Sequence, residues 1–242
     1  MNAIELHNVS RTFGTGLDAT LAVDNLSLAV PTGSVFGLLG ANGAGKTTSI
    51  RMMVAHLRPD SGSVRVLGED PADFNESLRN RVAYISENMQ LPHWMTIPVA
   101  AKYCAKMYPN WNAGLVGELA NRFKLSLKKR YDEFSKGQRR AMCIVLALAQ
   151  NAEVLILDEP ASGLDTLARR DFLSNMLEFV CDGNRTVLFS SHILGDIERI
   201  VDQVAIMVAG KLIVCGELDK LKADGKMNLE DLFVETVGTT KG

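Results

Sequence analysis

The chain has 242 residues, of which 47% are hydrophobic and 22% are charged, and its formal net charge is −2. This composition supplies a core for one large domain, and the scattered lysines and arginines lack the basic footprint of a nucleic-acid-binding protein. Four cysteines without paired spacing predict neither a zinc site nor disulfides, and without a signal pattern or an apolar run longer than residues 141–149 we expect a cytoplasmic chain with no direct membrane insertion.

The first part of the chain alternates strand and turn signals. Strands are expected at residues 4–6 and 21–30, and the second is expected to break at the turn-forming pair in positions 24–25. A Pro-Thr-Gly turn then leads into an apolar run at residues 35–39, which predicts a buried strand.

A glycine-rich loop follows this strand and precedes apolar residues that recur at helical spacing as far as Leu57. The loop matches the pattern G-x-x-x-x-G-K-[ST] in the strand-loop-helix context that the pattern requires. Its backbone N–H groups would surround phosphate oxygens, Lys46 would reach the β- and γ-phosphates, and the Thr47 hydroxyl would ligate Mg²⁺. The motif predicts nucleoside triphosphate binding by Gly40, Ala41, Asn42, Gly43, Ala44, Gly45, Lys46, Thr47 and Thr48.

The rest of the chain predicts an α/β fold with a helical insertion. Helical spacing without strand signals occupies residues 88–150, between an α/β core formed by residues 1–87 and 151–242. Short apolar strands separated by helices imply a parallel sheet covered by helices on both faces. Further strands are expected at residues 64–67, 82–85, 154–157 and 186–189, and a hairpin at 204–214 that turns at Ala209-Gly210.

Two acidic residues close the strand at residues 154–157. Asp158 could hold Mg²⁺ beside the phosphates, and Glu159 is placed to accept a proton from an attacking water. Acidic residues at strand ends are also common caps of the next helix. The pair therefore indicates a catalytic site only in combination with the glycine loop.

Two further segments have both a structural and a functional interpretation. Ser135 and Gln138 form the capping-box pattern S-x-x-Q, yet a capped helix start is also an anion site, and the residues alone leave the choice open. His192 follows an expected strand and could contact a γ-phosphate, although its own surroundings favour a helix-start residue satisfied by backbone groups.

Taken together, these segments resemble the ATP-binding subunits of ABC transporters. The resemblance covers nearly the whole chain as a single domain, residues 1–242, and extends to an ending at residues 228–233. It implies a P-loop NTPase core, an antiparallel β subdomain and an inserted all-helical lobe. The motifs that carry it are the glycine loop, residues 134–138, residues 155–159, residues 162–165 and His192.

The resemblance implies ATP and Mg²⁺ as cofactors and gives the matching residues roles in ATP hydrolysis. Phe13 would stack on the adenine, and Lys46 would hold the phosphates. Thr47 and Asp158 would hold Mg²⁺. Glu159 would be the general base, and His192 would lie near the γ-phosphate.

The resemblance also implies partners. Ser135, Gly137 and Gln138 would contact the γ-phosphate of ATP held by a second ATP-binding subunit, either another copy or a related chain. Two subunits would close around two ATP molecules and move separate transmembrane subunits on the inner face of the cell membrane. One glycine loop leaves the γ-phosphate partly exposed, and the N-terminus of the partner's helix would complete the stabilisation of its charge.

The chain departs from the family pattern near these motifs. Glu87 stands where most members have glutamine; a carboxylate could still ligate Mg²⁺ or its water, and Gln90 is an alternative by register. Lys136 replaces a glycine of the signature segment, where its charge could strengthen phosphate attraction.

The helical segment looks most like the branch that serves bacterial drug and antibiotic exporters. Trp94 and neighbouring apolar residues could form a groove for a membrane subunit, or Trp94 and Trp111 could simply pack the lobe. Two other functions stay open: a soluble ABC-type switch unconnected with transport, and an ATP-dependent binding module with weak hydrolysis.

Overall fold

The computed structural model describes residues 1–73, 75–181, 185–193, 195, 198, 200–222, 231 and 233–234, with the side chains of residues 167–168 and 177–181 excepted. Of the ending expected at residues 228–233, only positions 231 and 233 lie within this part of the chain. The chain divides into two compact units, residues 1–78 with 186–242 and residues 79–185.

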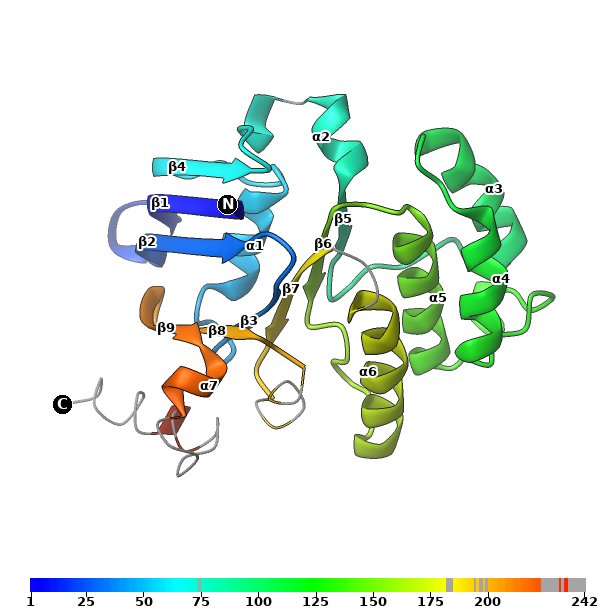
Figure 1. Cartoon of the computed structure of the whole chain (residues 1–242). Helices are drawn as coiled ribbons and strands as arrows, with labels where there is room; N and C mark the ends of the chain where they lie inside the picture. The colour runs from blue at the N-terminus through cyan, green and yellow to red at the C-terminus, as the bar shows by residue number, and fades with distance from the viewer. Residues whose placement is uncertain are drawn as a thin grey trace. The chain divides into compact units, whose positions relative to one another are not determined.

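The first unit contains an antiparallel sheet (Figure 1). The break expected at residues 24–25 is wrong, because the strand that contains them continues through a bulge. Asn25 has φ 50° and its amide bonds the Ser10 hydroxyl, while the pairing shifts register between Val9 and Arg11. The sheet order is β2 (Thr20–Pro31), β1 (Asn2–Phe13) and β4 (Ser61–Val66).

A second group of strands in this unit carries the glycine loop. The central strand β3 pairs in parallel with β7 and with β8, which explains why all its residues are buried. The hairpin that turns at Ala209 and Gly210 is confirmed, with both residues in the left-handed region. The strands in sheet order are β7 (Thr186–Ser191), β3 (Val35–Leu39), β8 (Gln203–Val208) and β9 (Lys211–Glu217).

The helix after the glycine loop is shorter than its apolar spacing predicts. It ends at Met53 with Val54 as C-cap, because Ala55 adopts φ 58° and turns the chain before Leu57. The helical elements of this unit are η1 (Gly16–Asp18), α1 (Lys46–Met53), η2 (Pro71–Asp73) and α7 (Leu218–Leu221), and α2 (Glu76–Arg81) contains the boundary between the units.

The second unit combines a parallel strand pair with helices. Helix α5 packs against α3, α4, α6 and β5, so residues on all its sides are buried (Figure 1). None of the helices described combines the length and hydrophobicity that a bilayer-spanning segment requires. The elements are β5 (Val82–Ile85), α3 (Ile97–Met107), α4 (Ala113–Arg122), η3 (Tyr131–Glu133), α5 (Lys136–Ala149), β6 (Val154–Asp158) and α6 (Thr166–Cys181).

Candidate functional site

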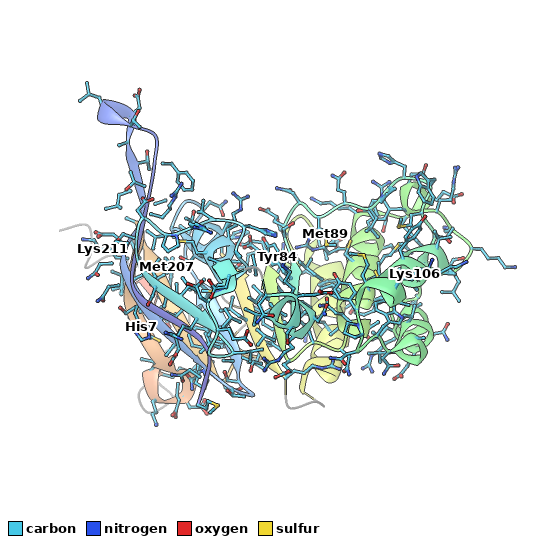
Figure 2. All side chains as sticks on the ribbon, turned by 90° about the horizontal axis from the view of Figure 1, so that it is seen from above. His7, Tyr84, Met89, Lys106, Met207 and Lys211 are labelled. Atoms are coloured by element: carbon cyan, nitrogen blue, oxygen red, sulfur yellow. The ribbon has the colours of Figure 1, made fainter. Side chains whose placement is uncertain are left out.

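The glycine loop connects β3 to α1 and passes close to two other strands of its unit. A Cβ on Gly40 would lie 2.5 Å from the carbonyl oxygen of Met207 on β8, which is labelled in Figure 2. Gly45 is the N-cap of α1 with φ 99°, and a Cβ there would lie 2.5 Å from the Ala22 carbonyl oxygen on β2. The packing therefore demands glycine at both positions.

The loop places a lysine charge at its centre. Lys46 is buried, and its ammonium Nζ donates to the Gly40 carbonyl at 2.7 Å and to the Ala41 carbonyl at 3.2 Å. Ala44 and Gly45 are buried, Thr47 and Thr48 are half-buried in the first turn of α1, and the tip of the loop at residues 41–43 is exposed. A cation and a helix N-terminus thus lie behind an accessible glycine loop, an arrangement that favours a phosphate anion.

His192 lies next to this loop through strand pairing. It directly follows β7, whose last residue Ser191 pairs with Leu39 of β3, and the Gly40 amide donates to the Ser191 carbonyl at 3.3 Å. His192 itself is exposed. Because parallel strands end at the same edge of a sheet, the histidine segment and the phosphate loop share one edge.

Phe13 ends β1 and is 40% exposed. The guanidinium carbon of Arg11 lies 5.2 Å from the centroid of its ring, and Arg11 also forms an ion pair of 2.5 Å with Asp60. Figure 2 shows the β1–β2 hairpin extending beyond the rest of its unit. The ring is therefore accessible for stacking while Arg11 restrains it, a contact that the sequence did not indicate.

The acidic pair lies in the second unit at the end of β6. Asp158 and Glu159 are 1% and 7% exposed. Glu159 has φ 47°, a left-handed conformation that costs about 1 kcal/mol or more for a residue with a side chain. Strain of this kind persists only where neighbouring contacts hold it, and here the Glu159 carbonyl accepts hydrogen bonds from the buried Arg140 guanidinium and from the Ser162 amide. Arg140 was not identified from the sequence, where it directly precedes the apolar run of residues 141–149.

Glu87 lies in the exposed loop after β5. Its carboxylate Oε1 accepts a hydrogen bond of 3.0 Å from the Ser162 hydroxyl. This contact joins the Glu87 loop to the segment at residues 162–165. Gln90, the alternative by register, is also exposed.

Both parts of the capping box at the start of α5 are formed. The Gln138 amide donates to the Ser135 hydroxyl at 3.3 Å, and the Ser135 amide donates to the Gln138 side-chain oxygen at 3.2 Å. Ser135 stays exposed, Gly137 is half-buried, and a Cβ on Gly137 would lie 3.1 Å from the Leu164 side chain. The structural interpretation is realised, and it leaves the helix start accessible to an anion.

The side chain of Lys136 contacts a glycine of its own unit. Its side chain lies against Gly163, which has φ 72°, so closely that any side chain at position 163 would collide with the ammonium group. The Lys136 side chain therefore lies over Gly163 of its own chain.

Trp94 does not pack the interior of the helical unit, because it is 56% exposed. Tyr103 and Met107 of α3 are 58% and 66% exposed, and Met89 is exposed in the loop after β5. These four side chains form the set that we call the exposed apolar residues of the helical unit.

The glycine loop that opens α1, with the acidic pair that ends β6, defines a P-loop nucleoside triphosphatase. The family model for ABC transporters matches residues 23–162, more than half of the chain. The chain therefore belongs to the ABC transporter family, as one of its ATP-binding proteins.

Individual relatives agree with this assignment. The chain is 33% identical to the bacitracin transport ATP-binding protein BcrA of Bacillus licheniformis, over 86% of this chain and 69% of that protein. It is 31% identical to the daunorubicin/doxorubicin resistance ATP-binding protein DrrA of Streptomyces peucetius, over 85% and 64%. A solved ATP-binding subunit of an ABC transporter superposes with a TM-score of 0.83 at 30% identity, covering 97% of this chain and 99% of that one.

The predicted α/β P-loop fold and the family are thus confirmed, and the chain is an ATP-binding protein of a family of ATPases. Among the curated relatives, this chain spans between 63% and 75% of the relative's own length.

Proposed function

We propose that this chain is the ATP-hydrolysing subunit of an exporter, and that two such subunits close around two ATP molecules to drive separate transmembrane subunits. The names of BcrA and DrrA, a transport protein and a drug-resistance protein, support the outward direction. The observation that carries the proposal is the buried Lys46 ammonium held inside an accessible glycine loop.

Phosphate binding falls to the glycine loop. The Lys46 ammonium and the N–H groups at the start of α1 bind phosphate oxygens through charge-assisted hydrogen bonds. Phe13 stacks on the adenine ring. Residues of one unit thereby hold both the phosphates and the adenine ring of ATP. This unit can therefore bind ATP before hydrolysis begins.

Mg²⁺ fits the residues present. Among the described side chains no group of three His, Cys, Asp or Glu lies together, and none is needed, because Mg²⁺ beside nucleotide phosphates uses one or two protein ligands with phosphates and water. Thr47, Asp158 and Glu87 are the candidates to hold it. The ion would neutralise charge that develops on the phosphate oxygens.

Hydrolysis requires a base and an orienting group. The Glu159 carboxylate accepts a proton from the attacking water, and His192 contacts the γ-phosphate or that water. Ser135, Gly137 and Gln138 present the exposed start of α5 to ATP held by a second subunit, where its dipole and N–H groups add charge stabilisation. Closure around ATP and release after hydrolysis then produce the movement that the membrane subunits use.

Attachment to the membrane is indirect. The exposed apolar residues of the helical unit offer Trp94 and its neighbours to an apolar segment of a transmembrane subunit. The chain would then lie peripherally on the inner face of the cell membrane.

Light scattering after size-exclusion chromatography of the Glu159→Gln variant tests the proposal. Without the base, ATP is bound but not cleaved, so Mg-ATP should convert monomer to dimer, while Lys46→Ala should stay monomeric. A Glu159→Gln variant that binds ATP and remains a monomer would contradict pairing of identical subunits. The rate of ATP hydrolysis by the wild-type protein, measured in the same preparation, distinguishes an ATP-hydrolysing transporter subunit from a binding module with weak hydrolysis.

A further inference from the structure

Arg140 is a buried charge in the second turn of α5, with 8% of its surface exposed. Its guanidinium donates five hydrogen bonds, and every acceptor is a backbone carbonyl oxygen. They run from Nη1 to Ser86 at 2.6 Å and Glu87 at 3.0 Å, from Nη2 to Asp158 at 2.9 Å and Glu159 at 3.0 Å, and from Nε to Pro160 at 2.8 Å.

These acceptors belong to two separate segments of the same unit. One is the loop after β5 that contains Glu87, and the other is the turn that leaves β6 at the acidic pair. Only a planar group with five N–H donors can serve this set, since a lysine ammonium has three donors arranged around one atom. Arg140 is therefore not interchangeable with lysine here.

The charge of Arg140 is sustained by its surroundings. Burial lowers the pKa of the Arg140 guanidinium below its ordinary value, and the nearby carboxylates of Asp158 and Glu87 oppose that decrease. A cation stripped of water and surrounded by carbonyl dipoles is stable only while those hydrogen bonds are intact. The contacts and the charge consequently depend on each other.

The turn that Arg140 holds is strained. Glu159 adopts φ 47°, and its carbonyl accepts both from Arg140 and from the Ser162 amide at 3.1 Å. Release of the guanidinium would allow Glu159 to return to an ordinary backbone conformation, and its carboxylate would leave the position set by β6.

We propose that Arg140 is a positioning residue for hydrolysis, which fixes the strained backbone of Glu159 and ties it to the Glu87 loop. The proposal rests on the base role of Glu159 given above. It separates hydrolysis from nucleotide binding, because the glycine loop and Phe13 belong to the other unit.

The test compares Arg140→Lys with Arg139→Lys in the full chain. Arg139 is a matched control, because it also donates to backbone carbonyls, those of Tyr131 and Asp132, but away from the acidic pair. Arg140→Lys should lower kcat at least about tenfold and change the ATP dissociation constant less than about threefold, whereas Arg139→Lys should keep kcat within about twofold. An Arg140→Lys variant that folds and retains wild-type kcat would overturn the proposal, as would equal losses in both variants.

Measuring Glu159→Gln in parallel distinguishes a failure of the base role of Glu159 from a failure of the positioning role of Arg140. If it still hydrolyses ATP, the base assignment fails; if it is inactive while Arg140→Lys is fully active, only the positioning role fails. Should Arg140→Lys not fold, hydrogen exchange in the wild-type chain decides. The Ser162 amide should then exchange as slowly as the amides of α5, and fast exchange at Ser162 with a protected α5 would refute the proposal.

Discussion

The Ser162 hydroxyl donates a hydrogen bond of 3.0 Å to the Glu87 carboxylate. The two residues belong to motifs that are distant in the sequence, and the contact joins them within one unit. A glutamine at position 87 would offer a side-chain oxygen to the same hydroxyl. The carboxylate therefore adds charge to this position rather than a contact that only glutamate could make.

We expect Glu87→Gln to raise the Mg²⁺ concentration for half-maximal ATP hydrolysis by roughly threefold to tenfold, because an amide oxygen is a weaker ligand for Mg²⁺ than a carboxylate. A Mg²⁺ titration of the ATPase rate measures this. Ser162→Ala is the control, since it removes the hydrogen bond and keeps the charge. An unchanged Mg²⁺ requirement in Glu87→Gln would remove Glu87 from the metal site.

Phe13→Ala should weaken ATP binding by about 1–3 kcal/mol, or roughly fivefold to 150-fold, because stacking of an aromatic side chain on a base has this magnitude. Phe13→Trp should retain affinity, since it keeps a flat ring at the same half-exposed position. Calorimetric titration with ATP compares the three proteins. Equal affinity in Phe13→Ala and wild type would place the adenine elsewhere.

Burial raises the pKa of the Cys143 thiol to about 11, from an ordinary value of 9.0. The folded protein therefore keeps this proton where the unfolded chain loses it, so the stabilisation is complete below pH 9 and is lost as the pH rises toward 11. The free energy of unfolding of the wild type should fall by about 2 to 3 kcal/mol more than that of Cys143→Ala over this interval. Urea unfolding at each pH measures the difference, and parallel curves for the two proteins would disprove it.

Trp94→Ala should leave the chain as stable as wild type, because a side chain that is 56% exposed contributes little to the core. It should nevertheless reduce retention by the membrane subunits. Leu17→Ala is the control, since Leu17 is a fully exposed apolar residue of the other unit. Co-purification from detergent compares the variants, and equal retention of both would exclude Trp94 from the interface.

Local chemistry made several features predictable from the sequence. The strand at residues 35–39, the glycine loop and the helix start at Lys46 form one continuous segment. The apolar run and the glycine motif within this segment are sufficient to predict its strand, loop and helix. The hairpin turn at Ala209-Gly210 and the capping box at Ser135 are local in the same sense.

Features that neither apolar spacing nor residue charge specifies were not predictable. The spacing of apolar residues continues to Leu57, but the left-handed Ala55 ends α1. The contact between Lys136 and Gly163 joins residues 27 positions apart and has no local signal in the sequence. The role of Arg140 exists only because the Glu87 loop and the end of β6 converge on it.

The conformation of Glu159 has a consequence for engineering. At φ 47° the backbone favours glycine or asparagine, whereas the proposed chemistry requires a carboxylate. A search for stabilising substitutions would therefore select Glu159→Gly or Glu159→Asn, and the more heat-resistant protein would no longer turn over ATP. Thermal tolerance and turnover compete at this single position, so a screen for expression or melting temperature alone would enrich inactive variants.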